Sequence, residues 1–191
     1  MVNLTRIYTR TGDRGSTRLG DLSETSKTDP RLQAYADVDE TNAHLGVVLA
    51  GGDVAPEVAQ VLIHIQNDLF DVGADFSTPI PQTDPGYAQL RVEQGYVDRL
   101  EGWCDEFNEQ LPNLRSFILN GGTVASAHLH VARTVARRAE RAAWAAWEVH
   151  AETMNPLAIT YLNRLSDLLF ILARFENREN GDVLWVPGGE R

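Results

Sequence analysis

Four arginines on one predicted helix have the types and spacing best suited to chemistry in this chain. Arg133, Arg137 and Arg141 recur every four residues, and Arg138 lies beside them. A helix has about 3.6 residues per turn, so these side chains stack along one face, where like charges four apart repel each other. The row therefore predicts an anionic partner. Carboxylates of another helix or a polyphosphate, whose oxygens suit the guanidinium fork, would both serve.

The alternative is a solvated helix face, which is the commoner origin of a charged stripe. The same helix carries Trp144, Trp147 and many alanines, which indicate packing on several sides. Residues 121–147 hold four Arg and one Glu, a local charge of +3, whereas the whole chain carries −10. A basic cluster in an acidic chain favours a local role for these arginines.

The first 29 residues contain a second candidate site for an anion. Gly12 and Gly15 permit positive φ and close approach of the backbone, and hydroxyl and cationic side chains surround them. No Gly-Lys-Ser/Thr sequence marks a Walker A loop here, so a phosphate cradle of another kind and a mobile terminus are the two interpretations. The hydroxyl residues are Thr9, Thr11, Ser16 and Thr17, and the cationic residues are Arg10, Arg14 and Lys27.

Length and composition indicate a soluble protein of one domain, or at most two small ones. The chain has 191 residues, 43% of them hydrophobic, which supports a packed core. Its acidic balance argues against a nucleic-acid partner, and its single cysteine, Cys104, excludes an internal disulfide and suits a reducing compartment. No apolar run has the ~20 residues of a membrane helix, and the N-terminus lacks the apolar core of a signal peptide. We therefore expect a single domain over residues 1–191, cytoplasmic and not bound to a membrane.

Apolar spacing of three and four residues predicts five helices. Asp29-Pro30 and Asn155-Pro156 each combine an N-cap with a proline at the first helical position, and another helix begins near Pro56. The predicted helices cover about 30–50, 56–76, 97–111, 123–147 and 156–179, with a loop at 77–89. The fold class predicted is all-α, a five-helix bundle, and no Glu-x-x-His pair of a di-iron bundle occurs.

Three reactive side chains on these helices have structural interpretations. Cys104 falls on an apolar stripe and is interpreted as a core thiol. His128 and His130 are two residues apart and point to different sides of the helix, so they make a poor metal pair. A second face of the last helix would form a polar seam beside the arginines, and it carries Asn163, Asp167, Phe170 and Arg174.

Four blocks of sequence, in order along the chain, resemble one family, the PduO-type ATP:cob(I)alamin adenosyltransferases. The first is Tyr8-Thr-Arg-Thr-Gly-Asp-Arg-Gly15, with Lys27 at the family's spacing, and the second is Ala34-Tyr-Ala-Asp-Val-Asp-Glu-Thr-Asn42. The third is Phe117-Ile-Leu-Asn-Gly-Gly, followed by Leu129-His-Val-Ala-Arg-Thr-Val-Ala-Arg-Arg-Ala-Glu-Arg141. The fourth is Tyr161-Leu-Asn-Arg-Leu-Ser-Asp-Leu-Leu-Phe170, and together the blocks span nearly the whole chain.

The resemblance implies a ferritin-like up-down bundle (30–181) that assembles as a homotrimer with active sites between subunits. An ordered N-terminal loop (1–29) precedes the bundle, and a C-terminal tail (182–191) follows it. The implied reaction transfers the 5′-deoxyadenosyl group of ATP to the cobalt of cob(I)alamin and releases triphosphate. Mg²⁺ would come with ATP rather than on dedicated protein ligands, and cobalamin is a substrate. A reductase that supplies Co(I) and an adenosylcobalamin-dependent enzyme are the further partners implied.

The resemblance also assigns roles residue by residue. Arg133 matches an arginine that pairs with an aspartate of a neighbouring subunit, here Asp39, and Asp167 lies near the same seam. With Arg137, these are the expected catalytic residues. Phe117 matches the phenylalanine that displaces the lower axial base of cobalamin. The residues expected to bind ATP are Thr9, Arg10, Thr11, Gly12, Asp13, Gly15, Ser16, Thr17 and Lys27 of the loop, and Arg137, Arg138, Glu140, Arg141 and Asn163 of the bundle.

Three positions depart from the family pattern. Arg10 stands where many members have Lys, and Thr41 replaces a usual Leu. Asn120 replaces the Pro of Leu-Pro-Gly-Gly, a change expected to loosen the segment that carries Phe117.

Two other functions fit the same residues. A helical module that binds a nucleotide or polyphosphate as a regulatory signal would need the basic seam but no nucleophile. A plain interaction bundle would leave the arginines solvated. ATP would not raise the melting temperature of such a bundle, whereas a bound ligand stabilises the folded state by linkage.

Overall fold

The computed structural model describes residues 8, 10–51 and 53–190, so the predicted ATP contact of Thr9 lies outside the described residues. Two short strands, β1 (Ser16–Arg18) and β2 (Glu24–Ser26), come first, and single 3₁₀ turns lie at Ala151–Thr153 and Gly188–Glu190. The prediction of five helices is confirmed. They are α1 (Pro30–Ala50), α2 (Pro56–Ser77), α3 (Gln94–Asn108), α4 (Val124–His150) and α5 (Pro156–Glu176).

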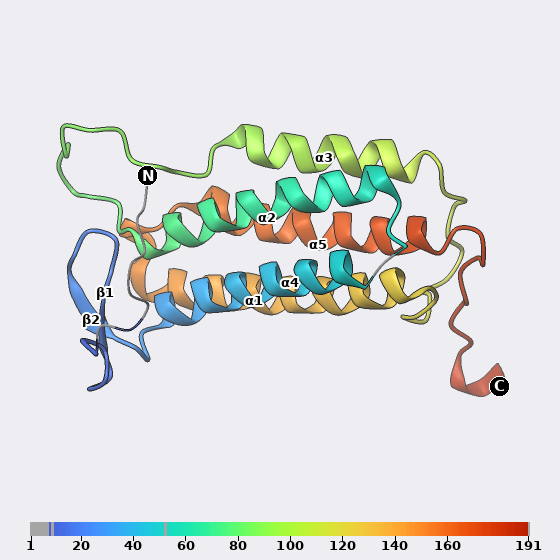
Figure 1. Cartoon of the computed structure of the whole chain (residues 1–191), viewed down its shortest axis with the longest axis horizontal. Helices are drawn as coiled ribbons and strands as arrows, with labels where there is room; N and C mark the ends of the chain where they lie inside the picture. Colours follow the sequence, from blue (N-terminus) through green and yellow to red (C-terminus); the bar gives the residue numbers. More distant parts are fainter. Residues whose placement is uncertain (1–7, 9, 52, 191) are drawn as a thin grey trace.

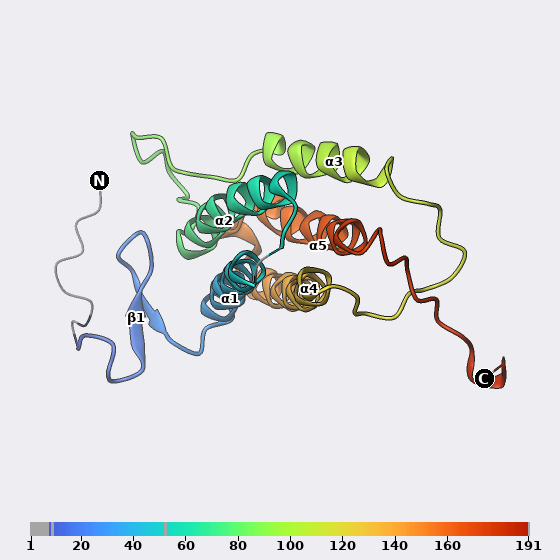
Figure 2. The same ribbon diagram turned by 45° about the vertical axis from the view of Figure 1, so that its right-hand side comes forward.

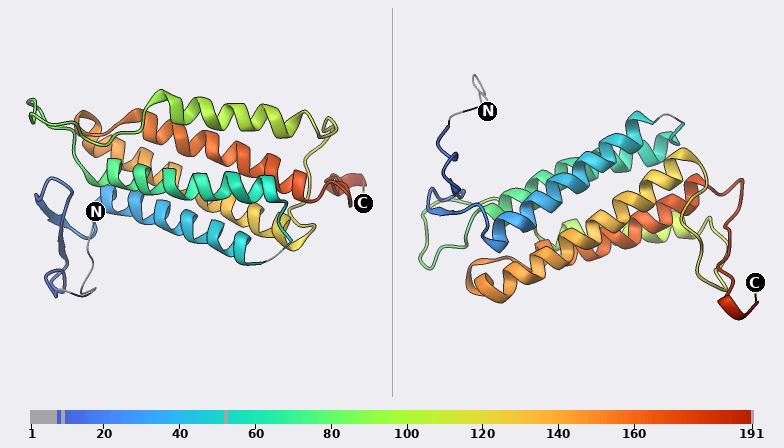
Figure 3. Two further views of the ribbon diagram at one scale, coloured as in Figure 1. Left: turned by 45° about the horizontal axis from the view of Figure 1, so that its top comes forward. Right: turned by 90° about the horizontal axis from the view of Figure 1, so that it is seen from below.

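Successive helices run in opposite directions along one elongated bundle (Figure 1). α1 packs against both α2 and α4, and α5 packs against α4 and α3, so α3 lies on the outside of the bundle (Figure 2). The β1–β2 hairpin lies at the end where α1 begins, and the C-terminal tail leaves at the opposite end (Figure 3). The residues of the hairpin and those of the C-terminal tail therefore lie at opposite ends of the bundle.

Polar caps and prolines explain where three helices start. Asp29 Oδ1 accepts a hydrogen bond from the backbone N–H of Arg31 at 2.8 Å, and Asn155 Oδ1 accepts one from Leu157 at 3.0 Å. Both caps precede a proline in the first turn. Thr123 caps α4 in the same way. Each such cap stabilises its helix by about 1 kcal/mol, and these predicted starts are confirmed.

Small residues on α4 let its neighbours approach closely. α1 and α5 both pack on this helix, and their buried leucines belong to the same core as its alanines. Because an alanine face takes little room, charged residues at its edges lie near the adjoining helices. The fully buried alanines of α4 are Ala132, Ala136, Ala139, Ala143 and Ala146.

Some boundaries differ from the prediction. Within residues 1–29, predicted as a loop, the structure has an antiparallel hairpin of β1 and β2 that pairs Ser16 with Ser26. These strands are short and polar, so they lack the alternating apolar pattern by which sequence reveals a strand. α5 ends at Glu176, before the predicted stop at Asn180-Gly181, because Asn177 caps it and the next residues turn. α3 likewise ends at Asn108, earlier than predicted.

A buried carboxylate fixes the long connection at 78–93. Apolar spacing in the sequence does not reveal this contact. Asp75 of α2 accepts hydrogen bonds from Arg91 Nη1, the backbone N–H of Val92 and Asn155 Nδ2, all at 2.7 Å. The cap of α5 is thereby tied to the end of α2. This network holds the hairpin end of the bundle together without contributing residues to the predicted site.

Within the described ranges, α5 is the one helix long and apolar enough to cross a membrane by length and composition. Core helices of helical bundles meet the same criterion. Leu162, Leu165, Leu168 and Leu169 are all fully buried, and α5 packs against α3 and α4. In this fold α5 is therefore a core helix.

Candidate active site

The hairpin and the turn before it enclose a polar hollow that gathers most of the N-terminal residues predicted to bind ATP. Its volume is about 640 Å³, within the usual range for ligand sites. Arg10, Asp13 and Gly15 are exposed beside it in the same turn. Arg18 and Glu24, which the sequence analysis did not single out, belong to the same wall. The lining residues are Thr11, Gly12, Ser16, Thr17, Arg18, Glu24 and Lys27.

Two glycines shape this turn. Gly15 has a φ of 84°, in the left-handed region that favours glycine, and its carbonyl accepts a hydrogen bond from the Lys27 N–H at 2.9 Å. A Cβ on Gly12 would lie 2.9 Å from Lys27 Nζ and 3.2 Å from the Ser16 carbonyl oxygen. The ammonium group therefore lies directly against the backbone of the turn. That arrangement places one positive charge beside the backbone of Gly12, in a hollow lined by hydroxyl side chains.

Asp29 fixes the base of the hairpin to the bundle. Its Oδ2 accepts a hydrogen bond from Thr25 Oγ1 at 3.0 Å, and its Oδ1 lies 2.9 Å from His150 Nε2 at the end of α4. Burial alone would raise the pKa of Asp29, but the hydrogen bonds from Arg31 N–H, His150 and Thr25 outweigh it, so the pKa is lowered. One carboxylate thus joins the hairpin, the start of α1 and the end of α4.

The arginines of α4 divide into paired and exposed side chains. Arg138 turns toward α1, where it forms ion pairs with Asp37 at 3.5 Å and with Glu40. Arg137 and Arg141 are exposed, and Arg141 Nη1 donates a hydrogen bond to the Arg137 carbonyl at 3.1 Å. Among the described residues, no ion pair joins either of these two to a carboxylate. The predicted carboxylate partners from another helix therefore pair with Arg138, whereas the guanidinium groups of Arg137 and Arg141 face solvent.

Arg133 lies deeper, where α4 meets the segment that carries Phe117. Its Nη2 donates a hydrogen bond to Asn120 Oδ1 at 3.2 Å, and its guanidinium carbon lies 5.9 Å from the centre of the Phe170 ring. Burial lowers the pKa of Arg133, and the nearby Arg137 lowers it further. Asn120, expected to loosen its segment, here ties that segment to α4.

Asn163 and Asp167 of α5 have different environments. Asn163 Nδ2 donates a hydrogen bond to Glu140 Oε1 at 2.9 Å, so it joins the arginine face of α4. Asp167 is exposed and accepts a hydrogen bond from Arg164 Nη1 at 2.8 Å, and Arg164 also binds Glu101 of α3. In a single chain Asp167 therefore pairs with Arg164, which also contacts α3, rather than with an arginine of α4.

Asp39 lies on a different side of α1 from the arginines. It is exposed and lines a groove between the hairpin, α1 and α2, beside Tyr35 and Phe70. Arg133, its predicted partner, donates to Asn120 instead. Within one chain, the described residues do not bring Asp39 and Arg133 together.

Phe117 is 79% exposed at the end of the bundle opposite the hairpin. The C-terminal tail pairs with its segment: the Trp185 N–H donates to the Phe117 carbonyl at 2.7 Å, and the Leu119 N–H donates to the Val183 carbonyl at 2.8 Å. The Phe117 and Trp185 rings meet edge to face, with 6.3 Å between their centres. Sequence analysis missed this role of the tail, although the apolar run 183–186 is a signal for it. Together these side chains form an exposed apolar surface.

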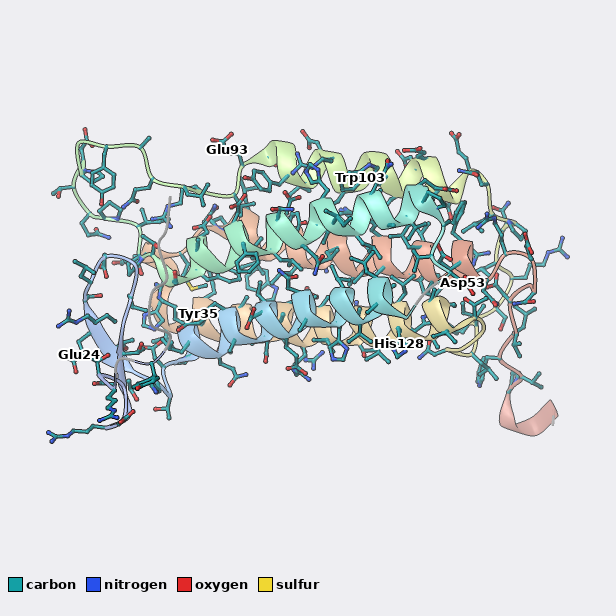
Figure 4. The ribbon with its side chains drawn as sticks, viewed as in Figure 1. Glu24, Tyr35, Asp53, Glu93, Trp103 and His128 are labelled. Atoms are coloured by element: carbon teal, nitrogen blue, oxygen red, sulfur yellow. The ribbon has the colours of Figure 1, made fainter. Side chains whose placement is uncertain are left out.

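In a single chain the hairpin lies apart from the exposed arginines, whereas the Phe117 segment reaches the arginine row through the hydrogen bond from Arg133 to Asn120. At 1.5 Å per residue along α4, Arg137 is roughly 20 Å from the cap at Thr123 and roughly 20 Å from His150. The hairpin is anchored near His150, and the Phe117 segment leads into Thr123. In Figure 4, Glu24 of the hairpin lies at one end of the bundle, and His128 of α4 lies toward the other. One chain therefore does not bring the hairpin and Arg137 together around one ligand.

Comparison with known proteins identifies the family. The family described as cobalamin adenosyltransferase matches residues 7–176. A corrinoid adenosyltransferase of Mycobacterium tuberculosis is 60% identical over 190 residues, covering 100% of this chain and 97% of that protein. A cobalamin adenosyltransferase of Cupriavidus metallidurans is 47% identical over 184 residues and covers 95% of each chain. The chain belongs to the cobalamin adenosyltransferase family.

Solved structures agree with this assignment. A phenylalanine-to-alanine variant of a PduO-type ATP:corrinoid adenosyltransferase from Lactobacillus reuteri, complexed with cobalamin and ATP, matches with a TM-score of 0.85 and 34% identity, covering 95% of this chain and 100% of that one. An arginine-to-lysine variant complexed with ATP matches with a TM-score of 0.81 and 35% identity, covering 94% and 100%. The enzyme is a transferase that moves the adenosyl group of ATP to a corrinoid, and the resemblance found in the sequence is confirmed.

Two carboxylates of α1 lie beside the predicted arginine site, although the sequence analysis gave them no role. Asp37 is buried against Arg138, and Glu40 binds the same guanidinium group. Their spacing of three residues, which places both on one side of a helix, is the signal that could have indicated a shared partner. They hold Arg138 in place beside the exposed Arg137 and Arg141.

Proposed function

We propose that the enzyme transfers the 5′-deoxyadenosyl group of ATP to the cobalt of cob(I)alamin or a related corrinoid, with release of triphosphate, in sites shared between the subunits of a homotrimer. The single observation that carries the shared site is the separation of the hairpin from the exposed arginines along α4. A cyclic assembly can bring such parts together from adjacent copies. The alternating helix directions support the further proposal of a ferritin-like up-down bundle.

The hairpin would bind the polyphosphate of ATP. Thr11, Ser16 and Thr17 supply hydroxyl donors, and Lys27 supplies a positive charge against the backbone of Gly12. Arg10, Asp13 and Gly15 would complete the turn around the nucleotide. On α4 and α5, Glu140 and Asn163 are already hydrogen-bonded to each other and would present one polar face to the nucleoside.

The exposed arginines would act on the leaving group. When Co(I) attacks C5′ of ATP, the C5′–O bond breaks and negative charge accumulates on the triphosphate. Arg137 and Arg141, with Lys27 and the partly neutralised Arg138, would stabilise that charge. Because the cobalt substrate is itself the nucleophile, no serine or cysteine has to be activated. Burial raises the pKa of Cys104 to about 11, which keeps that side chain a thiol.

Mg²⁺ would be held by the phosphate oxygens of ATP. Within the described ranges, no group of three or more His, Cys, Asp or Glu residues is arranged to hold a metal ion. When bound, the ion neutralises phosphate charge and orients the leaving group. The residues of the hairpin would then bind a Mg-ATP complex rather than the free nucleotide.

The corrin would lie on the exposed Phe117 ring. That contact would keep water and an axial ligand from one face of the cobalt, which makes reduction to Co(I) easier. Across the subunit boundary, Asp39 would pair with Arg133, whose Nε has no partner in the described structure. Asp167, free of contact with the α4 arginines, would lie near the same boundary.

We further propose that the enzyme works in the cytoplasm with a reductase that supplies Co(I) and an adenosylcobalamin-dependent enzyme that receives the product. Its single cysteine supports a reducing compartment. The need for a reductase follows from the reaction, because Co(I) is consumed as the nucleophile.

An anaerobic assay tests the proposal. The protein is mixed with chemically reduced cob(I)alamin and Mg-ATP, the visible spectrum of cobalt is followed, and triphosphate is measured. We expect light-sensitive adenosylcobalamin and triphosphate in equal amounts. ATP that binds without yielding triphosphate would instead identify a regulatory nucleotide binder.

A further inference from the structure

Two Asn-Gly sequences occur in the chain, Asn120-Gly121 and Asn180-Gly181. Asparagine before glycine is prone to deamidation, because glycine has no side chain to shield its backbone nitrogen. That nitrogen attacks the asparagine Cγ, ammonia leaves, and water opens the resulting cyclic imide to aspartate or isoaspartate. The structure gives the two sites different surroundings, so their reactivities should differ.

The Asn180-Gly181 site is held in a hydrogen-bonded turn after α5. The Gly181 N–H donates to the Asn177 carbonyl at 3.0 Å, and Asn180 Nδ2 donates to Asn177 Oδ1 at 3.2 Å. The attacking nitrogen must therefore lose a hydrogen bond before it can react, and the side-chain amide is held through its own nitrogen. This turn protects Asn180.

The Asn120-Gly121 site has a free backbone nitrogen. Asn120 is exposed and belongs to no helix or strand. The pairing with the C-terminal tail ends just before it, where the Leu119 N–H donates to the Val183 carbonyl. Among the described residues, the Gly121 N–H donates to no acceptor. This nitrogen can therefore react without first breaking a hydrogen bond within the protein.

Arg133 of α4 provides a positive charge at the oxygen that becomes negative in the reaction. Its Nη2 donates to Asn120 Oδ1 at 3.2 Å, and the Phe170 ring lies beside the same guanidinium group. When the Gly121 nitrogen attacks Cγ, negative charge accumulates on Oδ1. A charged donor already directed at that oxygen stabilises the charge, and more strongly where it is partly shielded from water.

We propose that Asn120 is a site of spontaneous deamidation, assisted by Arg133, which replaces the amide beside that guanidinium group with a carboxylate. In the first step the bond from Gly121 N to Cγ forms and the Cγ–Nδ2 bond breaks. Nδ2 leaves as ammonia, with the proton that the Gly121 nitrogen gives up. Water then opens the imide: breaking the new bond gives aspartate, and breaking the original peptide bond gives isoaspartate. Water is the only co-reactant.

A carboxylate at position 120 would change the partner of Arg133. This consequence rests on the proposed function, in which Arg133 pairs with Asp39 of an adjacent chain. A carboxylate within the same chain would compete with Asp39 for the guanidinium group. Isoaspartate would also add a carbon atom to the main chain of the segment that carries Phe117. The modified enzyme should therefore transfer the adenosyl group more slowly.

Peptide mapping by mass spectrometry tests the site, with Asn180 as a control in the same molecule. The full-length protein is incubated in mildly alkaline buffer, either folded or unfolded in urea, and both Asn-Gly sites are followed over time. In urea the two sites should react at similar rates. In the folded protein Asn180 should react roughly two- to tenfold more slowly, because one hydrogen bond must break, whereas Asn120 should not be slowed. Equal protection of the two sites would overturn the proposal.

Substitution of Arg133 tests the assistance. Arg133→Met removes the charged donor and should slow the reaction at Asn120 by tenfold or more, about the strength of one charged hydrogen bond. Arg141→Met is the matched control, since Arg141 lies on the same helix and donates to a helix carbonyl instead. It should leave the rate at Asn120 unchanged. The rate at Asn180 shows whether each variant keeps its fold, and an unchanged rate at Asn120 in Arg133→Met would contradict the assistance.

Two further variants measure the effect on catalysis. Asn120→Asp reproduces one product and should have lower transferase activity than the fresh wild type. Asn120→Gln keeps an amide for Arg133 but closes a six-membered ring less readily, so it should keep its activity during incubation. The wild type should lose activity in parallel with modification at Asn120. Modification without loss of activity would overturn this consequence, whereas the mass spectra test the site even if the proposed transfer reaction fails.

Discussion

At the scale of single residues, Arg137 is the side chain whose loss should separate chemistry from folding. It is exposed, and in the described structure no carboxylate pairs with it. We expect Arg137→Ala to lower kcat by about 10²–10³-fold, the usual loss when one donor to a developing charge is removed. The unfolding free energy should stay within ~0.5 kcal/mol, as for other surface substitutions. Arg137→Lys keeps the charge but loses the two-pronged guanidinium geometry, so its kcat should lie between those of the wild type and Arg137→Ala. An unchanged kcat in Arg137→Ala would show that Arg137 does not have the assigned role.

Cys104 gives a prediction about pH at the same scale. Burial raises its pKa to about 11, with the nearby Asp167 adding to the effect. At pH 8 about one thiol in a thousand is then ionised, against roughly one in four for an unfolded cysteine of pKa ~8.5. We expect the folded protein to react with a disulfide reagent roughly 10- to 20-fold more slowly than the unfolded chain, because the greater nucleophilicity of a thiolate with a higher pKa offsets part of the loss in thiolate. The rate should rise with pH as the thiolate fraction grows, and a rate near that of free cysteine would contradict the burial.

The sequence predicted which residues gather at the candidate site better than it predicted the side chains that they contact. The spacing of Arg133, Arg137 and Arg141 indicated an anion site, and Thr11, Gly12 and Lys27 do line one hollow. Spacing within one helix cannot show which side chains of another helix face it, so the pairing of Arg138 with Asp37 was not foreseen. The hydrogen bond from Arg133 to Asn120 depends in the same way on how two distant segments pack.

At the scale of elements, caps and prolines located helix starts correctly, whereas strands and helix ends were less visible. Asp29, Thr123 and Asn155 cap their helices by short-range hydrogen bonds that a sequence records directly. The β1–β2 hairpin depends on anchoring by the bundle, since a two-stranded hairpin is at best marginally stable alone. A local pattern could not reveal a contact such as that between Asp29 and His150, which joins residues far apart in the chain.

That anchoring can be tested through Asp29 and Thr25. Asp29→Ala removes the cap of α1 and the hydrogen bond from the hairpin, so it should lower the unfolding free energy by about 1–2 kcal/mol and raise the KM for ATP severalfold. Thr25→Val removes the hairpin hydrogen bond but leaves the cap. It should raise the KM for ATP with a smaller loss of stability. Urea unfolding and ATP kinetics measure both effects, and an unchanged KM in the two variants would show that the hairpin needs no anchor.

At the scale of the whole molecule, apolar spacing predicted the fold, whereas the homotrimer was expected from the family resemblance alone. Five amphipathic helices with short connections admit few arrangements, so a bundle followed from apolar spacing. The position of Asp39 in a groove away from Arg133 becomes meaningful only if a second copy supplies the missing partner. Residues that meet between chains leave no periodic signal within one chain.

Mixing two inactive variants tests the shared site directly. We propose that Lys27 of the hairpin and Arg137 of α4 act on one ATP from adjacent chains, so Lys27→Ala and Arg137→Ala should each abolish most activity in a homotrimer. Light scattering should give a mass about three times the 21.2 kDa of one chain. When the two variants are unfolded together in equal amounts and refolded, chains assort at random.

In such mixed trimers, each boundary that joins the intact hairpin of one variant to the intact α4 of the other forms a complete site. Random assortment makes about one boundary in four complete, so activity should recover to about a quarter of the wild-type value. Each variant refolded alone serves as the control and should stay inactive. If both residues belonged to a site within one chain, every chain in the mixture would lack one of them and no activity would return. The recovered fraction therefore measures whether the separation of the hairpin and the arginines along α4 is resolved between chains.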